Sequence, residues 1–144
     1  MNKQRFLLAF IVVFVLLELL NYIIFSVILM PSLEAVKDVF RTGEEMMSKM
    51  WIMYITDIIW SFFFVFFFVK GYEKKGIGEG IRFGIYIGLF FSFVSAYSQF
   101  VIYPLPYSMI FGWFVYGLIE MVILGIVTAL IYNPKEEIHA AASL

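Results

Sequence analysis

Four long apolar stretches constrain what this chain can fold into. They cover approximately residues 6–30, 50–70, 81–103 and 107–132, and each has the roughly 20 apolar residues that a helix needs to cross a bilayer. Because lipid offers the backbone no hydrogen bonds, only helices and closed barrels can span it. The sequence therefore predicts an all-α, integral membrane four-helix bundle that forms a single membrane domain over residues 1–144.

The composition argues against several other classes of protein. Hydrophobic residues make up 63% of the chain and charged residues only 15%, which leaves too few polar side chains to cover a soluble domain. The formal net charge of −1 and the lack of a dense basic patch argue against nucleic acid as a partner. The chain contains no cysteine, so disulfides and thiolate metal sites are excluded.

The basic residues indicate how the four stretches are oriented. Pro104 and Pro106 separate the third and fourth stretches and cannot continue a helix, so these two stretches form an antiparallel hairpin. Seven basic residues then fall on one side (Lys3, Arg5, Lys70, Lys74, Lys75, Arg82 and Lys135) and three on the other (Lys37, Arg41 and Lys49). The positive-inside rule places both termini, the turn 70–80 and the tail 133–144 in the cytoplasm.

The external segment 31–49 has a helical pattern of its own. Leu33, Val36 and Phe40 recur at helical spacing, Pro31 can open a helix and Gly43 can close it. We expect a short amphipathic helix between the first two spans. It either lies along the membrane surface or caps the bundle as a solvated helix.

Three acidic residues lie alone in otherwise uncharged stretches. Glu18 is the only charged residue between positions 6 and 33, Asp57 between 50 and 69, and Glu120 between 83 and 133. A charged side chain at the bilayer centre costs about 3 kcal/mol on insertion scales, so such residues face a protein interior and indicate function. Counted from the span ends, Glu18 and Glu120 lie at mid-bilayer, whereas Asp57 lies nearer the outer face, level with Gln99.

Polar side chains accompany these acids at helical spacing. Asn21 follows Glu18 by three residues and Tyr116 precedes Glu120 by four, so each shares the helix face of its acid. The candidate ligands of an ion or a proton are therefore Glu18, Glu120, Asp57, Asn21, Gln99 and Tyr116.

No Lys, Arg or His lies near these acids within the spans. One interpretation is a site for a proton or a cation that moves. A second is structural, with protonated carboxyl groups hydrogen-bonded to Tyr, Ser or Asn of neighbouring helices. A third is that a partner subunit supplies the opposite charge.

Small residues form rows on the last two stretches. The third stretch aligns Gly84, Gly88, Ser92, Ser95 and Gln99, and the fourth aligns Gly117, Met121, Gly125 and Ala129. Such rows let helix backbones approach closely. We expect these rows to mediate helix packing, within the bundle or between copies.

Methionines gather where the second stretch begins. Met46, Met50 and Met53 fall on one helix face, and thioethers suit soft ions such as Cu(I). Methionine is also a common filler of apolar gaps, so this group is either a metal site or ordinary packing. No other cofactor is expected. We expect no enzymatic activity, because the spans hold neither a histidine base nor a Ser/Lys pair at depth.

Two segments carry a resemblance to known proteins. The sequence KGYEKKGIGEGIRFGIYIGL at 70–89, and the stretch from YPLPY at 103–107 through Trp113, Gly117 and Glu120, resemble small four-span bacterial membrane proteins of unassigned function. The second stretch continues to Gly125 and the pair Ile131–Tyr132. The resemblance implies a four-helix fold in the bacterial inner membrane and implies no activity.

Small multidrug resistance transporters are similar in architecture. They have four spans, dimerise through the fourth helix, and use a glutamate of the first helix to exchange protons for cations. Glu18 and the Gly117/Gly125 row occupy comparable places here. The 19-residue outer segment and the second mid-depth acid depart from that pattern.

The pattern as a whole suggests a small proton- or cation-coupled transporter or channel-like protein, with Asp57 at the outer entrance. The alternative is a non-catalytic accessory or structural subunit of a larger membrane complex. In either case we expect contact with membrane lipids, and either a homo-oligomer or other membrane subunits as partners.

Overall fold

The structure, a computed structural model, describes residues 2–41 and 43–133, and every regular element within them is helical. Four helical segments are long and apolar enough to cross a membrane: Lys3–Ile28, Gly43–Lys70, Ile77–Ile102 and Tyr107–Tyr132. The predicted all-α chain with four helices of spanning length is therefore confirmed for the described residues. The tail from position 134 onward, with His139 and Lys135, lies outside the described residues.

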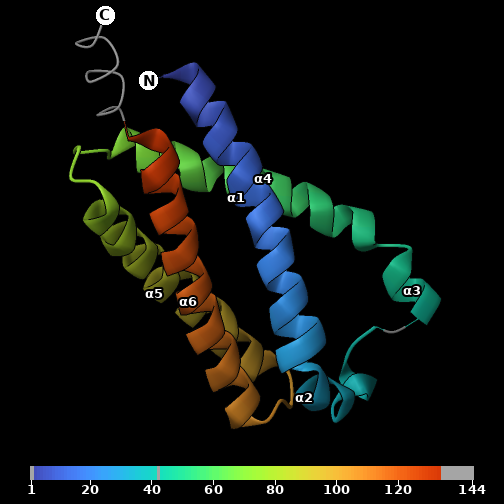
Figure 1. The fold of residues 1–144 in the computed structure, drawn as a ribbon. Helices are drawn as coiled ribbons and strands as arrows, with labels where there is room; N and C mark the ends of the chain where they lie inside the picture. The colour runs from blue at the N-terminus through green and yellow to red at the C-terminus, as the bar shows by residue number, and fades with distance from the viewer. Residues whose placement is uncertain (1, 42, 134–144) are drawn as a thin grey trace, which may run out of the picture.

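Helices α5 (Ile77–Ile102) and α6 (Tyr107–Tyr132) form the closest pair in the molecule. They lie side by side and antiparallel along most of their length (Figure 1). The face that α5 turns toward α6 consists of small buried residues: Gly80, Gly84, Gly88, Ser92 and Ala96. A Cβ atom added at Gly84 would lie 2.5 Å from the carbonyl oxygen of Met121, so only glycine permits this approach. The two prolines end α5 and start α6, and Pro106 is the N-cap of α6.

Helix α1 (Lys3–Ile23) packs against both α4 (Met50–Lys70) and α6. Its buried residues Ala9, Val13 and Leu17 recur every four residues and therefore lie on one helix face. They form a core cluster with Phe64 and Val65 of α4 and with Met121 and Leu124 of α6. This cluster joins three of the four long helices.

Helix α4 crosses α1 obliquely instead of running parallel to the bundle (Figure 1). Its buried residues Ser61, Phe64, Val65 and Phe68 all lie in its second half. The first half, including Trp51 at 61% exposure, projects away from α5 and α6. The bundle is consequently open along one side.

The connection between α1 and α4 differs from the single amphipathic helix expected from the sequence. The described residues form a π-helical turn at Ile24–Ile28, the short helix α2 (Met30–Glu34), a 3-10 turn at Lys37–Val39 and the helix α3 (Gly43–Met47). Gly43 does not close a helix but begins α3, with a φ of 58°. The helical pattern breaks because the backbone of Val36 leaves the α conformation at φ −124° and ψ 23°.

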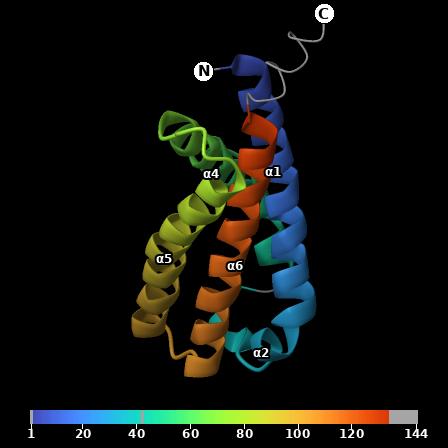
Figure 2. The same cartoon turned by 60° about the vertical axis from the view of Figure 1, so that its left-hand side comes forward.

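This connection nevertheless buries the apolar residues that suggested it. Leu33, Val36, Val39 and Phe40 pack against a cluster of Ala96, Leu105, Met109 and Ile110 at the α5–α6 hairpin. Figure 2 shows α2 next to the lower ends of α1 and α6. The segment therefore covers one end of the bundle.

The opposite end holds the N-terminus and the end of α6 (Figure 1). Asn2 caps α1 by accepting hydrogen bonds from the backbone N–H groups of Gln4 and Arg5, both at 3.1 Å. The backbone N–H of Asn2 also donates to the Tyr132 hydroxyl at 3.2 Å. These contacts tie the start of the first long helix to the end of the last.

Candidate functional site

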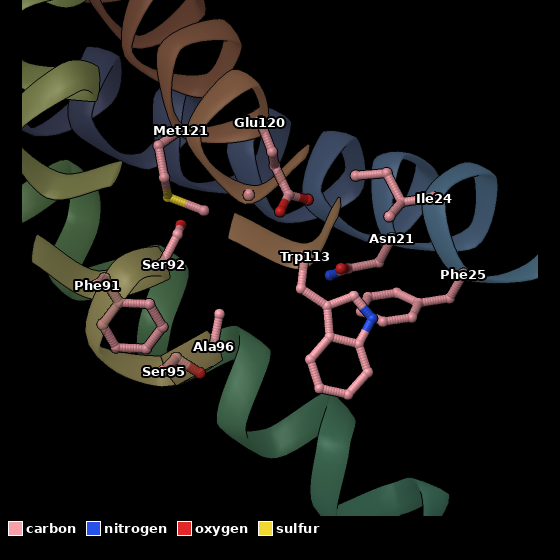
Figure 3. A pocket seen from close by; sticks show the side chains of 11 residues that line it. Asn21, Ile24, Phe25, Phe91, Ser92, Ser95, Ala96, Trp113, Glu120 and Met121 are labelled. Carbon is pink, nitrogen blue, oxygen red and sulfur yellow. The ribbon is translucent and has the colours of Figure 1, made fainter. Parts of the chain in front are cut away.

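Glu120 lies in the interior of the bundle beside a cavity. Its side chain comes from the middle of α6 and only 6% of the residue is exposed. The cavity has a volume of about 200 Å³ and is also lined by Asn21 of α1, Ser92 and Ser95 of α5, and Trp113 of α6. Figure 3 shows the Glu120 carboxylate and the Asn21 amide pointing into this space. Oε1 of Glu120 is buried and accepts no hydrogen bond from any described residue.

An isolated buried carboxylate oxygen costs free energy, because desolvation is not repaid by a hydrogen bond. No Lys, Arg or His is among the residues that line the cavity. The cavity therefore offers a negative or protonated oxygen together with an amide and two hydroxyl groups. These groups can hold water, a proton or a small cation.

Trp113 lies two helical turns before Glu120 on α6, and its indole lines the same cavity. Its Nε1 atom is buried and has no hydrogen-bond partner among the described residues. The ring packs edge-on against Phe25, with 6.2 Å between centroids, and is tilted against Phe40 at 6.3 Å. Ring packing, and not a hydrogen bond, positions this indole.

Glu18 and Asp57 form a second acidic pair. Both residues are half-buried, and their carboxyl groups interact across the α1–α4 contact. Asp57 also acts electrostatically on Glu120. Oε1 of Glu18 is buried and, among the described residues, has no hydrogen-bond partner.

This arrangement differs from the depth levels expected from the sequence. Counting from the span ends grouped Glu18 with Glu120 and set Asp57 apart with Gln99, whereas the structure makes Asp57 the acidic neighbour of Glu18. Helix α4 crosses α1 obliquely (Figure 1), and counting residues from the span ends does not take such a crossing into account.

The three acids do not form a metal site together. Within residues 2–41 and 43–133, no group of three or more His, Cys, Asp or Glu side chains is placed to hold a metal ion. A divalent ion usually requires several carboxylate ligands.

A larger groove lies next to the cavity. It has a volume of about 810 Å³, and its walls come from α3, α4, α5, α6 and the connection after α1. Met46, Met50 and Met53 all line it, and so does Gln99. Arg41 and Lys49 also line it, each in contact with Glu45, at 2.8 Å and 3.6 Å. Binding of a soft metal by the three methionines stays a prediction.

Most of the remaining candidate residues lie at the α5–α6 contact or at the edge of the cavity. Tyr116 is half-buried beside Gly112 and does not line the cavity. Gly84, Gly88 and Ser92 contact α6, where Ser92 meets Gly117. Gly125 meets Gly80, a residue outside the predicted row. Ser95 is exposed and lines both the cavity and the groove.

Three further residues of interest were not among the candidate ligands predicted from the sequence. Trp113 could have been found from its seven-residue distance to Glu120, which places both on one face of α6. Ser61 follows Asp57 by four residues, a spacing that predicts a shared helix face, and it is fully buried with no hydrogen-bond partner for its hydroxyl among the described residues. The sequence places Glu79 in the turn 70–80, but in the structure only 5% of Glu79 is exposed.

Glu79 organises the loop between α4 and α5. Its carboxylate accepts hydrogen bonds from the backbone N–H groups of Glu73 at 2.6 Å and Lys75 at 3.0 Å. Glu73 in turn pairs with Lys75 at 2.7 Å and Arg82 at 2.6 Å. Hydrogen bonds from Lys75 and Arg82 lower the pKa of the exposed Glu73 carboxyl to about 2.

Comparisons of this chain with protein-family models, with curated proteins and with solved structures found no match. The functional interpretation therefore depends on the residues and geometry of the chain itself.

Proposed function

We propose that this chain is an integral protein of the bacterial inner membrane that carries a proton or a small monovalent cation. In this proposal the four long helices cross the bilayer with both termini in the cytoplasm, as the distribution of basic residues favours. Glu120 is the central binding group, and Glu18 and Asp57 form a second station next to it.

The observation that carries the proposal is the Glu120 cavity. Glu120 is 6% exposed, one of its carboxyl oxygens has no hydrogen-bond partner among the described residues, and it borders a space of about 200 Å³. This arrangement is unfavourable unless something occupies that space. A structural role would instead pair both oxygens with neighbouring side chains. The lack of a basic lining residue supports a bound proton or cation as the neutralising partner.

The position of Asp57 supports transfer between sites. Its carboxyl interacts with Glu18 and acts electrostatically on Glu120. Carboxyl groups that interact in this way do not ionise independently, so protonation of one favours ionisation of another. A proton or cation can therefore move between stations without leaving all three acids charged.

Proton flux in liposomes tests this function. The purified protein is reconstituted into liposomes that enclose a pH-sensitive dye, and a potassium diffusion potential made with valinomycin drives protons inward. A sodium-sensitive dye replaces the first dye in a parallel series. We expect flux of one of these ions above that of protein-free liposomes, and its loss in E120Q.

The matched control is E44Q, which changes an exposed acid on α3 and should leave the flux unchanged. Glutamine keeps the size of the side chain, so loss of flux reports loss of the ionisable group. The proposal would be contradicted if the proton flux and the sodium flux both stayed at the protein-free background. Equal flux in E120Q and the unchanged protein would contradict it as well.

A second candidate function, an accessory subunit or a homo-oligomer, is favoured by the first half of α4. Trp51 and Tyr54 are 61% and 48% exposed, and they precede the half-exposed Asp57 on a helix that projects from the bundle. A polar side chain on such a surface is stabilised by another protein more than by lipid. Purification in mild detergent followed by native mass spectrometry tests it: a second chain or copy that is lost in D57N supports the candidate, and a monomer in all preparations contradicts it.

A further inference from the structure

The Glu120 cavity and the large groove meet at a shared wall. Phe25, Ser95 and Trp113 line both hollows, whereas Asn21 and Ser92 line only the cavity and Gln99 lines only the groove. A path from the groove to Glu120 therefore runs from Gln99, past the three shared residues, to Asn21 and Ser92. The shared residues stand at the junction of the two hollows, where we expect the path to be constricted.

Two of the three residues at this constriction carry aromatic rings. Trp113 packs on Phe25 and Phe40 at centroid distances of 6.2 Å and 6.3 Å, and Figure 3 shows the Trp113 and Phe25 rings next to each other below Glu120. The buried Nε1 atom of Trp113 is not bonded to any described residue. No hydrogen bond therefore needs to break when the indole turns.

Phe25 is attached to an irregular part of the backbone. It lies in the π-helical turn Ile24–Ile28, where the regular hydrogen-bond pattern of α1 is interrupted. Turns of this kind occur frequently at functional sites, since they relax the register of a helix locally. The ring that faces Trp113 is thus carried by a segment able to shift without unfolding α1.

We infer that ions reach Glu120 from the groove and pass between Phe25, Ser95 and Trp113, with Trp113 as the residue that determines which ions are admitted. This inference rests on the proposed function and adds the route and the specificity-determining residue. The ligand is a hydrated proton or a compact monovalent cation, because the cavity supplies one carboxyl, one amide and two hydroxyl groups. Arg41 and Lys49 at the groove do not oppose this strongly, because Glu45 neutralises part of their charge.

Cysteine accessibility tests the route independently of transport. The chain has no native cysteine, so single-cysteine variants report one position each. Q99C lies on the groove side, S95C at the constriction, and S92C and N21C beyond it. Each variant is placed in nanodiscs and labelled with a small cationic methanethiosulfonate reagent, and labelling in denaturing detergent gives the maximum for each.

We expect Q99C and S95C to be labelled faster than S92C and N21C. Adding W113A should raise the rates of S92C and N21C about tenfold, equal to about 1.4 kcal/mol in the free energy of opening, and leave Q99C unchanged. Two cavity reporters are used because Ser92 packs on Gly117 and a cysteine there can disturb folding. The matched control for W113A is F111A, which shortens an exposed aromatic residue one half-turn away on α6.

Equal labelling of Q99C, S92C and N21C would overturn the inference, since it would show that no constriction exists. Unchanged S92C and N21C rates in W113A would overturn it as well. Failure of the proposed function can be distinguished from failure of this inference. The expected labelling rates together with an absence of ion flux would support the route and contradict the transport role. In the liposome assay, W113A should also increase the sodium-to-proton flux ratio, whereas a merely structural role would lower both fluxes equally.

Discussion

Gly80 of α5 lies directly against Gly125 of α6, and the carbonyl oxygen of each residue would clash with a Cβ atom added to the other. The contact is therefore one of backbone against backbone. It occurs near the end of the bundle that holds both the N-terminus and the end of α6. Lipid provides no hydrophobic driving force between helices, so such close contact supplies van der Waals attraction that holds α5 and α6 together.

Adding a methyl group at this contact should separate the helices. G125A places its Cβ against the Gly80 carbonyl oxygen, so we expect destabilisation of about 1–3 kcal/mol, the usual cost of overpacking. The measurement is the thermal unfolding midpoint in detergent. The control is G78A, whose Cβ would have no neighbour within 4 Å and which should be neutral or slightly stabilising. Equal midpoints for the two variants would contradict this account of the interface.

The sequence predicted the long helices well because their length and apolar composition are local properties. The hairpin of α5 and α6 followed from Pro104 and Pro106, because a helix interior does not accommodate two prolines separated by one residue. The course of α4 could not be predicted in the same way. Which part of its surface is buried depends on tertiary contacts of Phe64 and Phe68, and a run of phenylalanines carries no periodic signal.

The candidate site was predictable in part. Solitary acids identified Glu18, Asp57 and Glu120, since a charge in an apolar stretch stands out without any structure. Their grouping was not predictable, because it depends on the oblique course of α4 across α1, which has no signal in the sequence. Phe25 and Trp113 were missed because aromatic residues are abundant in every span, and only the shape of the cavity distinguishes these two.

The interaction between Glu18 and Asp57 should make their effects on stability non-additive. Two interacting carboxyl groups repel each other when both are charged, so E18Q and D57N should each stabilise the protein under mildly alkaline conditions. The double variant should gain no more than the better single variant, with a coupling free energy of about 0.5–3 kcal/mol. Unfolding midpoints of all four proteins provide the test. Additive effects would show that these carboxyl groups act independently, and destabilisation by both single changes would show that they do not repel each other.

The buried carboxylate of Glu79 should determine how firmly the α4–α5 loop is held. In E79Q one of the two backbone N–H groups would face an amide N–H instead of an oxygen, and an unsatisfied buried donor costs about 1–3 kcal/mol. We expect faster tryptic cleavage after Lys74 and Lys75 in E79Q. E73Q is the matched control, since it removes only exposed ion pairs and should be cleaved nearly as slowly as the unchanged protein. Equal cleavage rates of E79Q and E73Q would show that Glu79 does not hold the loop in this way.

The pairing of Glu73 should be visible in its titration. Lys75 and Arg82 lower its pKa from 4.5 to about 2, so the contribution of this carboxylate to folding is complete above its usual value and is lost as the pH falls toward about 2. The carboxyl chemical shift of isotopically labelled Glu73, followed by NMR in micelles, gives the midpoint directly. K75Q and R82Q should each raise the midpoint, because each removes one hydrogen-bond donor and one positive charge. K74Q removes a lysine of the same loop that is not bonded to Glu73 in the described residues, and it should change the midpoint least. A midpoint near 4.5 in the unchanged protein would mean that the loop does not hold these three side chains together in solution.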